Sequence, residues 1–126
     1  MTIEQAIKIF LLKKTEITNI VGQRISYATL PQGPTYPYLT FFRINNINAH
    51  DIDVSSVYFQ FDSWALTYIA AVELASQVRK ALQREKRVLS GINVIQGVYL
   101  NEDYNYESDT KLHLVSSDFK IIYREL

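Results

Sequence analysis

The segment that most constrains the fold is a long amphipathic stretch in the middle of the chain, residues 67–87. Its apolar residues recur at the spacing of one helix face, with Ala71, Leu74 and Val78 separated by three and four positions. Thr67 is the predicted N-cap, and the basic residues at the far end complement the negative end of the helix dipole. Such a helix has a core-facing stripe, so other parts of the chain must supply the surface that it covers.

Segments that alternate with period two lie on both sides of this helix and are rich in β-branched and aromatic residues. The predicted strands are residues 38–47, 57–64, 92–100 and 112–123. A shorter apolar stripe over residues 3–12 predicts a second amphipathic helix, with Thr2 as its N-cap. The order of these elements predicts one α+β domain over residues 1–126. We expect an antiparallel sheet of about four strands, with the long helix and the N-terminal helix packed on one face.

The composition excludes several classes of protein. The 126 residues suit one domain, and 48% hydrophobic with 21% charged residues is ordinary for a globular protein rather than a disordered or fibrous one. Thirteen basic and 13 acidic residues give a net charge of +0, which argues against a chain that mainly neutralises phosphates. No cysteine is present, so disulfides and cysteine-based zinc sites are excluded. No stretch approaches the roughly 20 apolar residues of a membrane span, and no signal peptide is predicted, so we expect the cytoplasm.

Two polar segments between the predicted strands, residues 45–56 and 101–109, are predicted loops. In the first, His50, Asp51 and Asp53 stand within four residues and could in principle bind a metal ion. The second histidine of the chain is far away in sequence, and no ligand spacing of a known metal site is present. A turn needs polar residues in any case, so we predict no metal site here.

Charged residues elsewhere do not form a catalytic set. Two of the four acidic residues Glu102, Asp103, Glu107 and Asp109 could act as paired carboxylates only if burial separated their pKa values, and a polar loop is a poor place for that. We predict a loop that faces solvent or a partner. Arg84 and Arg87 close a basic cluster that either is a solvated helix end or contacts nucleic acid or an acidic protein face. Because the sequence has no Gly-rich phosphate loop and no nucleophile elbow, we predict no enzyme and no cofactor.

The aromatic residues are more informative about function. Nine tyrosines and six phenylalanines are more than one compact core of this size needs. Tyrosine is enriched at protein interfaces because its ring buries area while its hydroxyl stays hydrogen-bonded. Tyr36, Tyr104 and Tyr106 lie in predicted loops, so we predict that they contact another protein chain. The alternative is local packing of these loops over the sheet.

Five segments together match a family pattern: LPQG at 30–33, YPYLTF at 36–41, FQFDSWA at 59–65, AVELASQVRKAL at 71–82 and LHLVSSDFKIIY at 112–123. In order and spacing they resemble the tail completion proteins of long-tailed bacteriophages, also called tail terminator or tail-to-head joining proteins. The resemblance covers about residues 17–126. It implies a structural virion protein that forms a ring, usually a hexamer, on the finished tail tube, stops its growth and docks to the head connector. It also implies that DNA passes through the ring without specific binding.

A ring forms when one patch meets a different patch on the next copy and the rotation closes. We therefore predict two distinct contact surfaces, on residues 45–56 and 101–109, with the basic helix end as a candidate contact to an acidic partner. The expected location is the head–tail interface of the virion, and the host cytoplasm during assembly. The alternative function is a nucleic-acid-binding α+β module that stacks bases on sheet aromatics and holds phosphates with the basic helix end.

Overall fold

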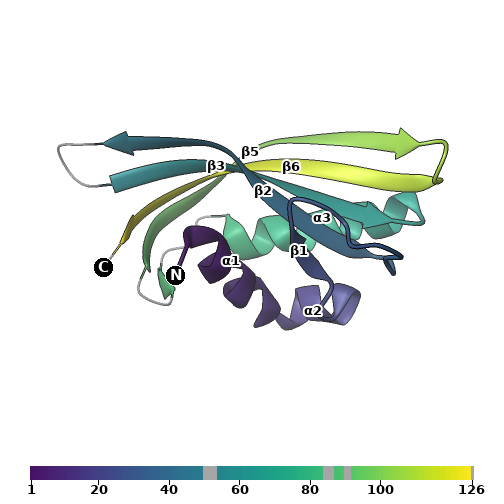
Figure 1. The fold of residues 1–126 in the computed structure, drawn as a ribbon, viewed down its shortest axis with the longest axis horizontal. Coiled ribbons are helices and arrows are strands. Elements are labelled where there is room, and N and C mark those ends of the chain that lie inside the picture. The colour runs from purple at the N-terminus through teal and green to yellow at the C-terminus, as the bar shows by residue number, and fades with distance from the viewer. Residues whose placement is uncertain (50–53, 84–86, 90–91, 126) are drawn as a thin grey trace.

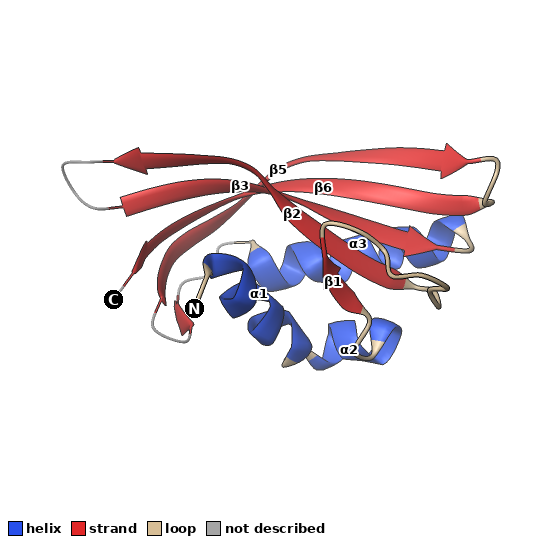
Figure 2. Ribbon diagram, viewed as in Figure 1, coloured by secondary structure: helices blue, strands red, loops and turns tan. Residues whose placement is uncertain are grey.

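The computed structural model describes residues 1–49, 54–83, 87–89 and 92–125 (Figure 1). In this part of the chain, three helices lie on one face of a six-stranded sheet with strand order β1-β2-β3-β6-β5-β4 (Figures 1 and 2). The helices are α1 (Ile3–Leu12), α2 (Thr15–Val21) and α3 (Tyr68–Leu82). The strands are β1 (Ile25–Tyr27), β2 (Tyr38–Ala49), β3 (Val54–Ala65), β4 (Arg87–Leu89), β5 (Ile92–Glu107) and β6 (Leu112–Glu125). The predicted α+β class, with helices on one face of a sheet, is confirmed.

The sheet is larger than the predicted one of about four strands, because it also includes β1 and β4. Each of these has only three residues, which is too short to show an alternating pattern. β1 also pairs parallel with β2, from Ile25 opposite Leu39 to Tyr27 opposite Phe41, whereas the other neighbours pair antiparallel. The prediction of four strands, all antiparallel, is therefore wrong in both respects.

The two segments predicted as loops are largely strand. β2 continues to Ala49 and β3 begins at Val54, while β5 continues to Glu107. Their backbones pair along two long hairpins, β2 with β3 and β5 with β6. Backbone pairing in a hairpin does not require apolar side chains, so the polar composition of these segments concealed the strands. The prolines, in contrast, do lie in an irregular connection between β1 and β2, as predicted.

The predicted long helix is α3, and it is shorter than expected. Thr67 is its N-cap, as predicted, and its hydroxyl oxygen accepts a hydrogen bond from the Ala70 amide at 3.2 Å. The helix ends at Leu82 because Gln83 has an extended backbone, with φ −65° and ψ 124°. Arg87, predicted as the last helical residue, lies in strand β4 instead. The prediction based on the run of basic residues therefore made the helix too long.

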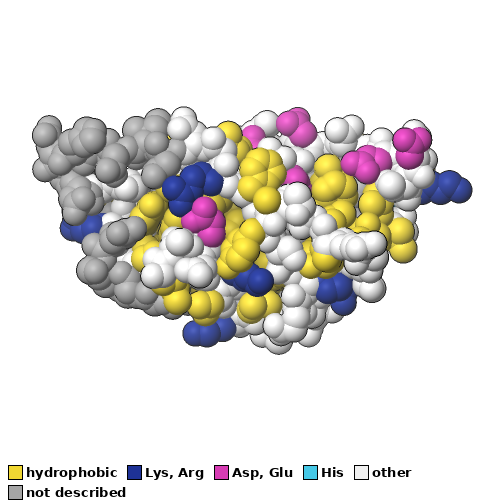
Figure 3. All heavy atoms as spheres, viewed as in Figure 1, with side chains coloured by type: hydrophobic (Ala, Val, Ile, Leu, Met, Phe, Trp, Pro, Cys, Tyr) yellow, Lys and Arg dark blue, Asp and Glu magenta, His cyan; other side chains and the backbone are white. Residues whose placement is uncertain are grey.

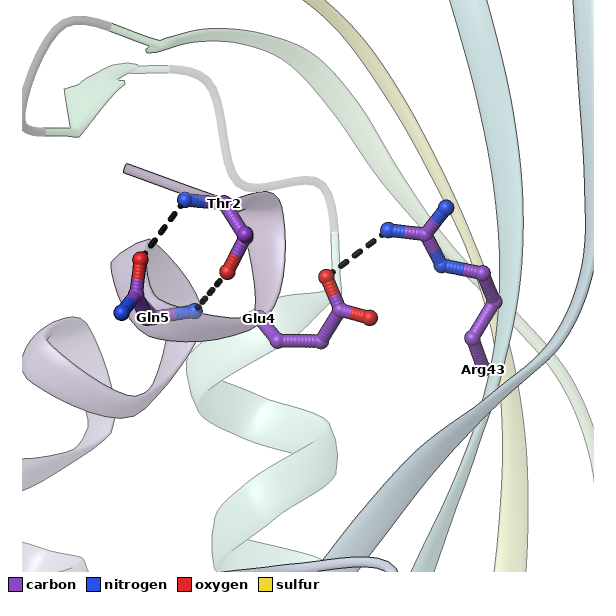
Figure 4. Close-up of polar contacts among 4 residues, drawn as sticks. All are labelled: Thr2, Glu4, Gln5 and Arg43. Atoms are coloured by element: carbon purple, nitrogen blue, oxygen red, sulfur yellow. Dashed lines mark hydrogen bonds and ion pairs between the residues drawn. The ribbon is translucent and has the colours of Figure 1, made fainter.

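Helix α1 is capped and tied to the sheet at its first turn (Figure 4). The Thr2 hydroxyl oxygen accepts from the Gln5 amide at 3.1 Å, and the Gln5 side-chain oxygen accepts from the Thr2 amide at 2.8 Å. This capping box satisfies two backbone donors that would otherwise lack partners. The Glu4 carboxylate forms an ion pair with Arg43 of β2 at 2.7 Å (Figure 4). The end of α1 is thereby fixed beside the middle of β2.

The core lies between the helices and the sheet and is built around aromatic rings. Phe41, Phe59, Phe61 and Phe119 come from three neighbouring strands and are fully buried. The rings of Phe41 and Phe61 stack at 5.0 Å between centroids, and Phe119 meets Phe61 edge-on at 5.5 Å. Burial of one such side chain contributes about 1.5–3 kcal/mol. These rings therefore hold the two layers together.

Helix α3 approaches β5 more closely than most helices approach a sheet. A Cβ atom at Gly97 would lie 2.0 Å from the carbonyl oxygen of Leu82, at the end of the helix. Only a residue without a side chain fits such a contact between two backbones. One turn earlier, the Arg79 guanidinium lies over the Tyr99 ring, 5.5 Å from its centroid. The last turn of α3 is therefore packed directly against β5.

Three β-bulges interrupt the strand pairing among the described residues. The pairing register shifts between Arg43 and Asn45 in β2, and between Val94 and Gln96 and between Tyr99 and Asn101 in β5. A bulge bends its strand and increases the local twist. Because β3 pairs antiparallel with both β2 and β6, the β2–β3 and β5–β6 hairpins extend towards opposite ends of the molecule in Figure 1. Within the described residues, no helix is both long and apolar enough to cross a membrane.

Candidate functional site

Four ring side chains meet where the β5–β6 hairpin leaves the helix layer, and we call this group the aromatic cluster. Its members are Tyr68, Tyr104, Tyr106 and His113. The Tyr104 ring meets Tyr68 edge-on at 4.9 Å and stacks on His113 at 5.9 Å. Tyr106 lies opposite His113 in the hairpin, with their rings 4.9 Å apart. The cluster therefore joins both strands of the hairpin to the first residue of α3.

The tyrosines of the aromatic cluster are exposed, although the four rings of the cluster contact one another. Tyr68, Tyr104 and Tyr106 retain 49%, 48% and 48% of their accessible surface. The Tyr104 hydroxyl and the Nδ1 atom of His113 are 2.7 Å apart and form a hydrogen bond. Near Tyr68 in the chain, Leu66 and Ile69 are 63% and 60% exposed. Exposed aromatic rings that contact each other in this way are characteristic of a protein interaction site.

The predicted contact residues of segment 101–109 thus lie on strand and turn. Tyr104, Tyr106 and Glu107 belong to β5, and Asp109 lies in the turn that follows; all four are exposed. The Glu107 carboxylate accepts a hydrogen bond from the Thr110 hydroxyl at 3.1 Å and so closes that turn. Figure 3 shows acidic side chains at the upper right, over this hairpin. The structure brings the two tyrosines together and gives Glu107 a role within the turn.

For the other predicted contact residues, the structure describes no side-chain position. His50, Asp51, Asp53 and Arg84 lie outside the described residues. Arg87 is described only as part of the β4 backbone. The predicted contact surfaces on segment 45–56 and on the basic helix end therefore stay predictions.

Tyr36, the third tyrosine predicted to contact a partner, is half-buried in the loop before β2. Burial raises the pKa of its phenol, and the Glu107 carboxylate raises it further. A partly buried ring fits the alternative prediction, packing of the loop over the sheet, as well as contact with a partner.

The face of the sheet opposite the helices, called the outer face below, carries a row of polar side chains. This row runs across four strands and pairs Thr40 with Asp62, Asp62 with Ser116, and Ser116 with Asp103. The Asp62 carboxylate accepts hydrogen bonds from the Ser116 hydroxyl at 2.8 Å and from the Gln60 amide at 2.9 Å. Only 6% of Asp62 is exposed, so these two donors replace most of its contact with water.

The next row of the outer face adds a third carboxylate. Burial raises the pKa of Asp118, and the negative charges of Asp103 and Asp62 raise it further. Asp118 lines a hollow of about 400 Å³ together with Tyr58 and the two bulge residues Ile44 and Leu100. In the described part of the chain, no three His, Asp or Glu side chains are grouped so that they could hold a metal ion.

Comparison with known proteins identifies the family. The family model for tail completion protein gp17 matches residues 5–124, which is nearly the whole chain. A solved chain from the virion of a native gene transfer agent particle has the same fold, with a TM-score of 0.79 and 17% identity. That match covers 96% of this chain and 93% of the other. No curated protein matches the chain. The family resemblance predicted from the sequence is confirmed, and the chain belongs to the tail completion protein gp17 family of structural phage tail proteins.

Proposed function

We propose that this chain caps the finished tail tube as a ring of identical copies, a hexamer in the simplest case, and joins the tail to the head connector. It would act in the virion, at the head–tail interface, after assembly in the host cytoplasm. Its family membership supports a role in tail completion. The observation that argues for assembly through specific contacts is the exposed aromatic cluster on the β5–β6 hairpin.

The aromatic cluster has the properties of an interface hot spot. Tyrosine is among the residues that contribute most to binding when they become buried at the centre of a contact. The hydrogen bond between Tyr104 and His113, and the edge-on contact with Tyr68, already restrict the rings in the free subunit. A pre-ordered ring loses little side-chain entropy on binding, so more of the gain from burial remains as affinity. The cluster therefore suits a contact to another virion protein or to a second copy.

The alternative, a nucleic-acid-binding module, receives little support from the sheet. Of the phenylalanines in the sheet, Phe41, Phe59, Phe61 and Phe119 face the helices and are fully buried, whereas Phe42 lies on the outer face and is half-buried. On the outer face, Asp62, Asp103 and Asp118 would repel phosphates rather than bind them. An acidic, polar surface suits the wall of a channel through which DNA slides without being held. We therefore assign the outer face to the lumen of the proposed ring.

The double substitution Tyr104→Ala/Tyr106→Ala tests the proposal. Both side chains are about half exposed, so the variant should fold with an unchanged circular dichroism spectrum. It should lose binding to tail tubes, measured as the mass of the purified protein alone and after mixing with tubes. Tyr27→Ala, which removes a 41% exposed tyrosine outside the cluster, is the matched control and should still bind.

Two results would contradict the proposed function. One is undiminished tube binding by the double variant. The other is DNA binding by the unaltered chain that weakens steeply between low and moderate salt, because that dependence indicates phosphate contacts.

A further inference from the structure

Two strands have long edges that no other strand covers among the residues described. β1 pairs only with Leu39–Phe41 of β2, and β4 pairs only with Ile92–Val94 of β5. Residues 42–49 of β2 and 96–107 of β5 therefore lie on the outside of the sheet, at its two opposite sides. Unpaired edges of this length can pair with a strand of another chain.

The directions of these two edges fit each other. The four long strands β2, β3, β6 and β5 alternate in direction, so β5 runs opposite to β2. Copies in a ring are related by rotation about the ring axis, so the component of β2 along that axis is the same in every copy. A β2 strand placed against the β5 edge of its neighbour is therefore antiparallel to it. The two would form an ordinary antiparallel ladder.

The charges along the two edges, including the part of β5 beyond residue 101, disfavour the pairing of two β5 edges over their full length. The exposed stretch of β5 contains Glu102, Asp103 and Glu107 and no basic residue. The exposed stretch of β2 contains Arg43 and no acidic residue. Two β5 edges would bring carboxylates opposite carboxylates, which destabilises a strand pair. β5 against β2 avoids this repulsion.

The two edges also have matching bends. The bulge at Ile44 of β2 and the bulge at Leu100 of β5 both adjoin one row of paired residues that crosses the sheet, made of Arg43, Phe59, Phe119 and Tyr99. Residues 42–47 of β2 and 96–101 of β5 lie in the same rows. An unstaggered seam between copies would place Leu100 and Ile44 on either side of this row, as diagonal neighbours across the seam. These apolar side chains are 46% and 51% exposed in the single chain and would cover each other.

We infer that copies of this chain join edge to edge, with residues 96–101 of β5 in one copy paired antiparallel with residues 42–47 of β2 in the next. The inference rests on the proposed function, because the seam closes the ring that the proposed function requires. It adds the surfaces and the register by which a second copy binds.

A disulfide between copies tests the seam. The chain has no cysteine, so the double variant Ile44→Cys/Leu100→Cys contains only the two thiols of interest. Within one copy the two backbones are three strand spacings apart, about 14 Å, which is too far for a disulfide. After mild oxidation on tail tubes, we expect a ladder of cross-linked species that ends at a closed ring, on a non-reducing gel. A second double variant, Lys13→Cys/Leu100→Cys, places the first thiol at an exposed position after α1, away from the seam, and should give no such ladder.

The single variants and a mass measurement make each result decisive. Efficient dimers from Ile44→Cys alone or Leu100→Cys alone would show that like edges pair, and would overturn the inference. A ring mass without cross-links in the double variant would also overturn it, while the proposed function would stand. If the unaltered chain forms no ring even with tail tubes, both the seam and the proposed function are wrong.

Discussion

The two faces of the sheet are made from the same strands but have opposite chemistry. Phe41 faces the helices and is fully buried, whereas its neighbour Phe42 lies on the outer face and is half-buried. On β3, Phe61 packs in the core while Asp62 belongs to the polar row. Alternation along each strand thus separates the residues that hold the fold together from those that meet the surroundings. The helix-facing side contains the core, and the outer face and the exposed end of the β5–β6 hairpin are the surfaces that the proposed function uses for assembly.

Adjacent phenylalanines on the two faces give the largest contrast. Phe41→Ala should lower the free energy of unfolding by about 3–5 kcal/mol, because it leaves a cavity among the core rings. Phe42→Ala, the same chemical change one residue away, should cost much less because that ring is already half in water. Denaturant unfolding of both variants measures the difference. Equal losses would mean that the outer face is as important for stability as the core.

A buried hydroxyl on the helix-facing side offers a gain in stability. The Ser63 Oγ atom is buried and has no hydrogen-bond partner among the residues that the structure describes. Removal of an unsatisfied buried polar atom should raise the free energy of unfolding by about 1 kcal/mol. Ser63→Ala should therefore have a higher melting temperature than the unaltered chain. Ser55→Ala, at the half-buried far end of the same strand, is the control; an equal gain there would indicate a general effect of serine replacement.

The smallest expected effect is a pH dependence that comes from the outer face. Burial and two neighbouring carboxylates raise the pKa of Asp118 in the folded chain above its ordinary value. Above that pKa, Asp118 is ionised in both states, but its ionisation costs more free energy in the folded state than in the unfolded state. The charged carboxylate therefore lowers the stability of the fold. Asp118→Asn should therefore raise the melting temperature at pH 7. The gain should shrink as the pH falls towards the ordinary aspartate pKa of about 3.9.

The matched control for this pH series is Asp109→Asn, in the exposed turn between β5 and β6. Melting temperatures of both variants are measured from pH 7 down to about 4. A gain from Asp118→Asn that stayed constant with pH would assign its cause to packing rather than to charge.

Much of the helix-facing side could be predicted from the sequence, because apolar periodicity reports burial directly. The start of α3 at its Thr67 cap, the capped helix α1 and the alternation of Phe59 and Phe61 were all predicted and are all observed. What could not be predicted depends on pairing between distant segments. β1 and β4 are too short for any pattern, and the polar arms of the hairpins form strands through backbone hydrogen bonds alone.

Only two of the four residues of the aromatic cluster could be predicted from the sequence, for the same reason. Tyr104 and Tyr106 stood out as tyrosines in a polar segment, and the structure keeps them exposed. Tyr68 and His113 join them through the register of the hairpin and the start of α3, which no periodicity reveals. One feature of the sequence could have predicted this contact. A hairpin turn at residues 108–111 places Tyr106 opposite His113.

The contact between Gly97 and the Leu82 carbonyl has a consequence for how this molecule can vary. Main-chain atoms meet there, and such atoms are the same in every amino acid. Substitutions can reshape the surfaces of α3 and β5 at many positions, yet the separation of the two elements has already reached its lower limit. The distance between α3 and β5, the strand that bears the tyrosines, therefore has a fixed minimum. Side-chain substitutions at other positions can increase this distance but cannot reduce it.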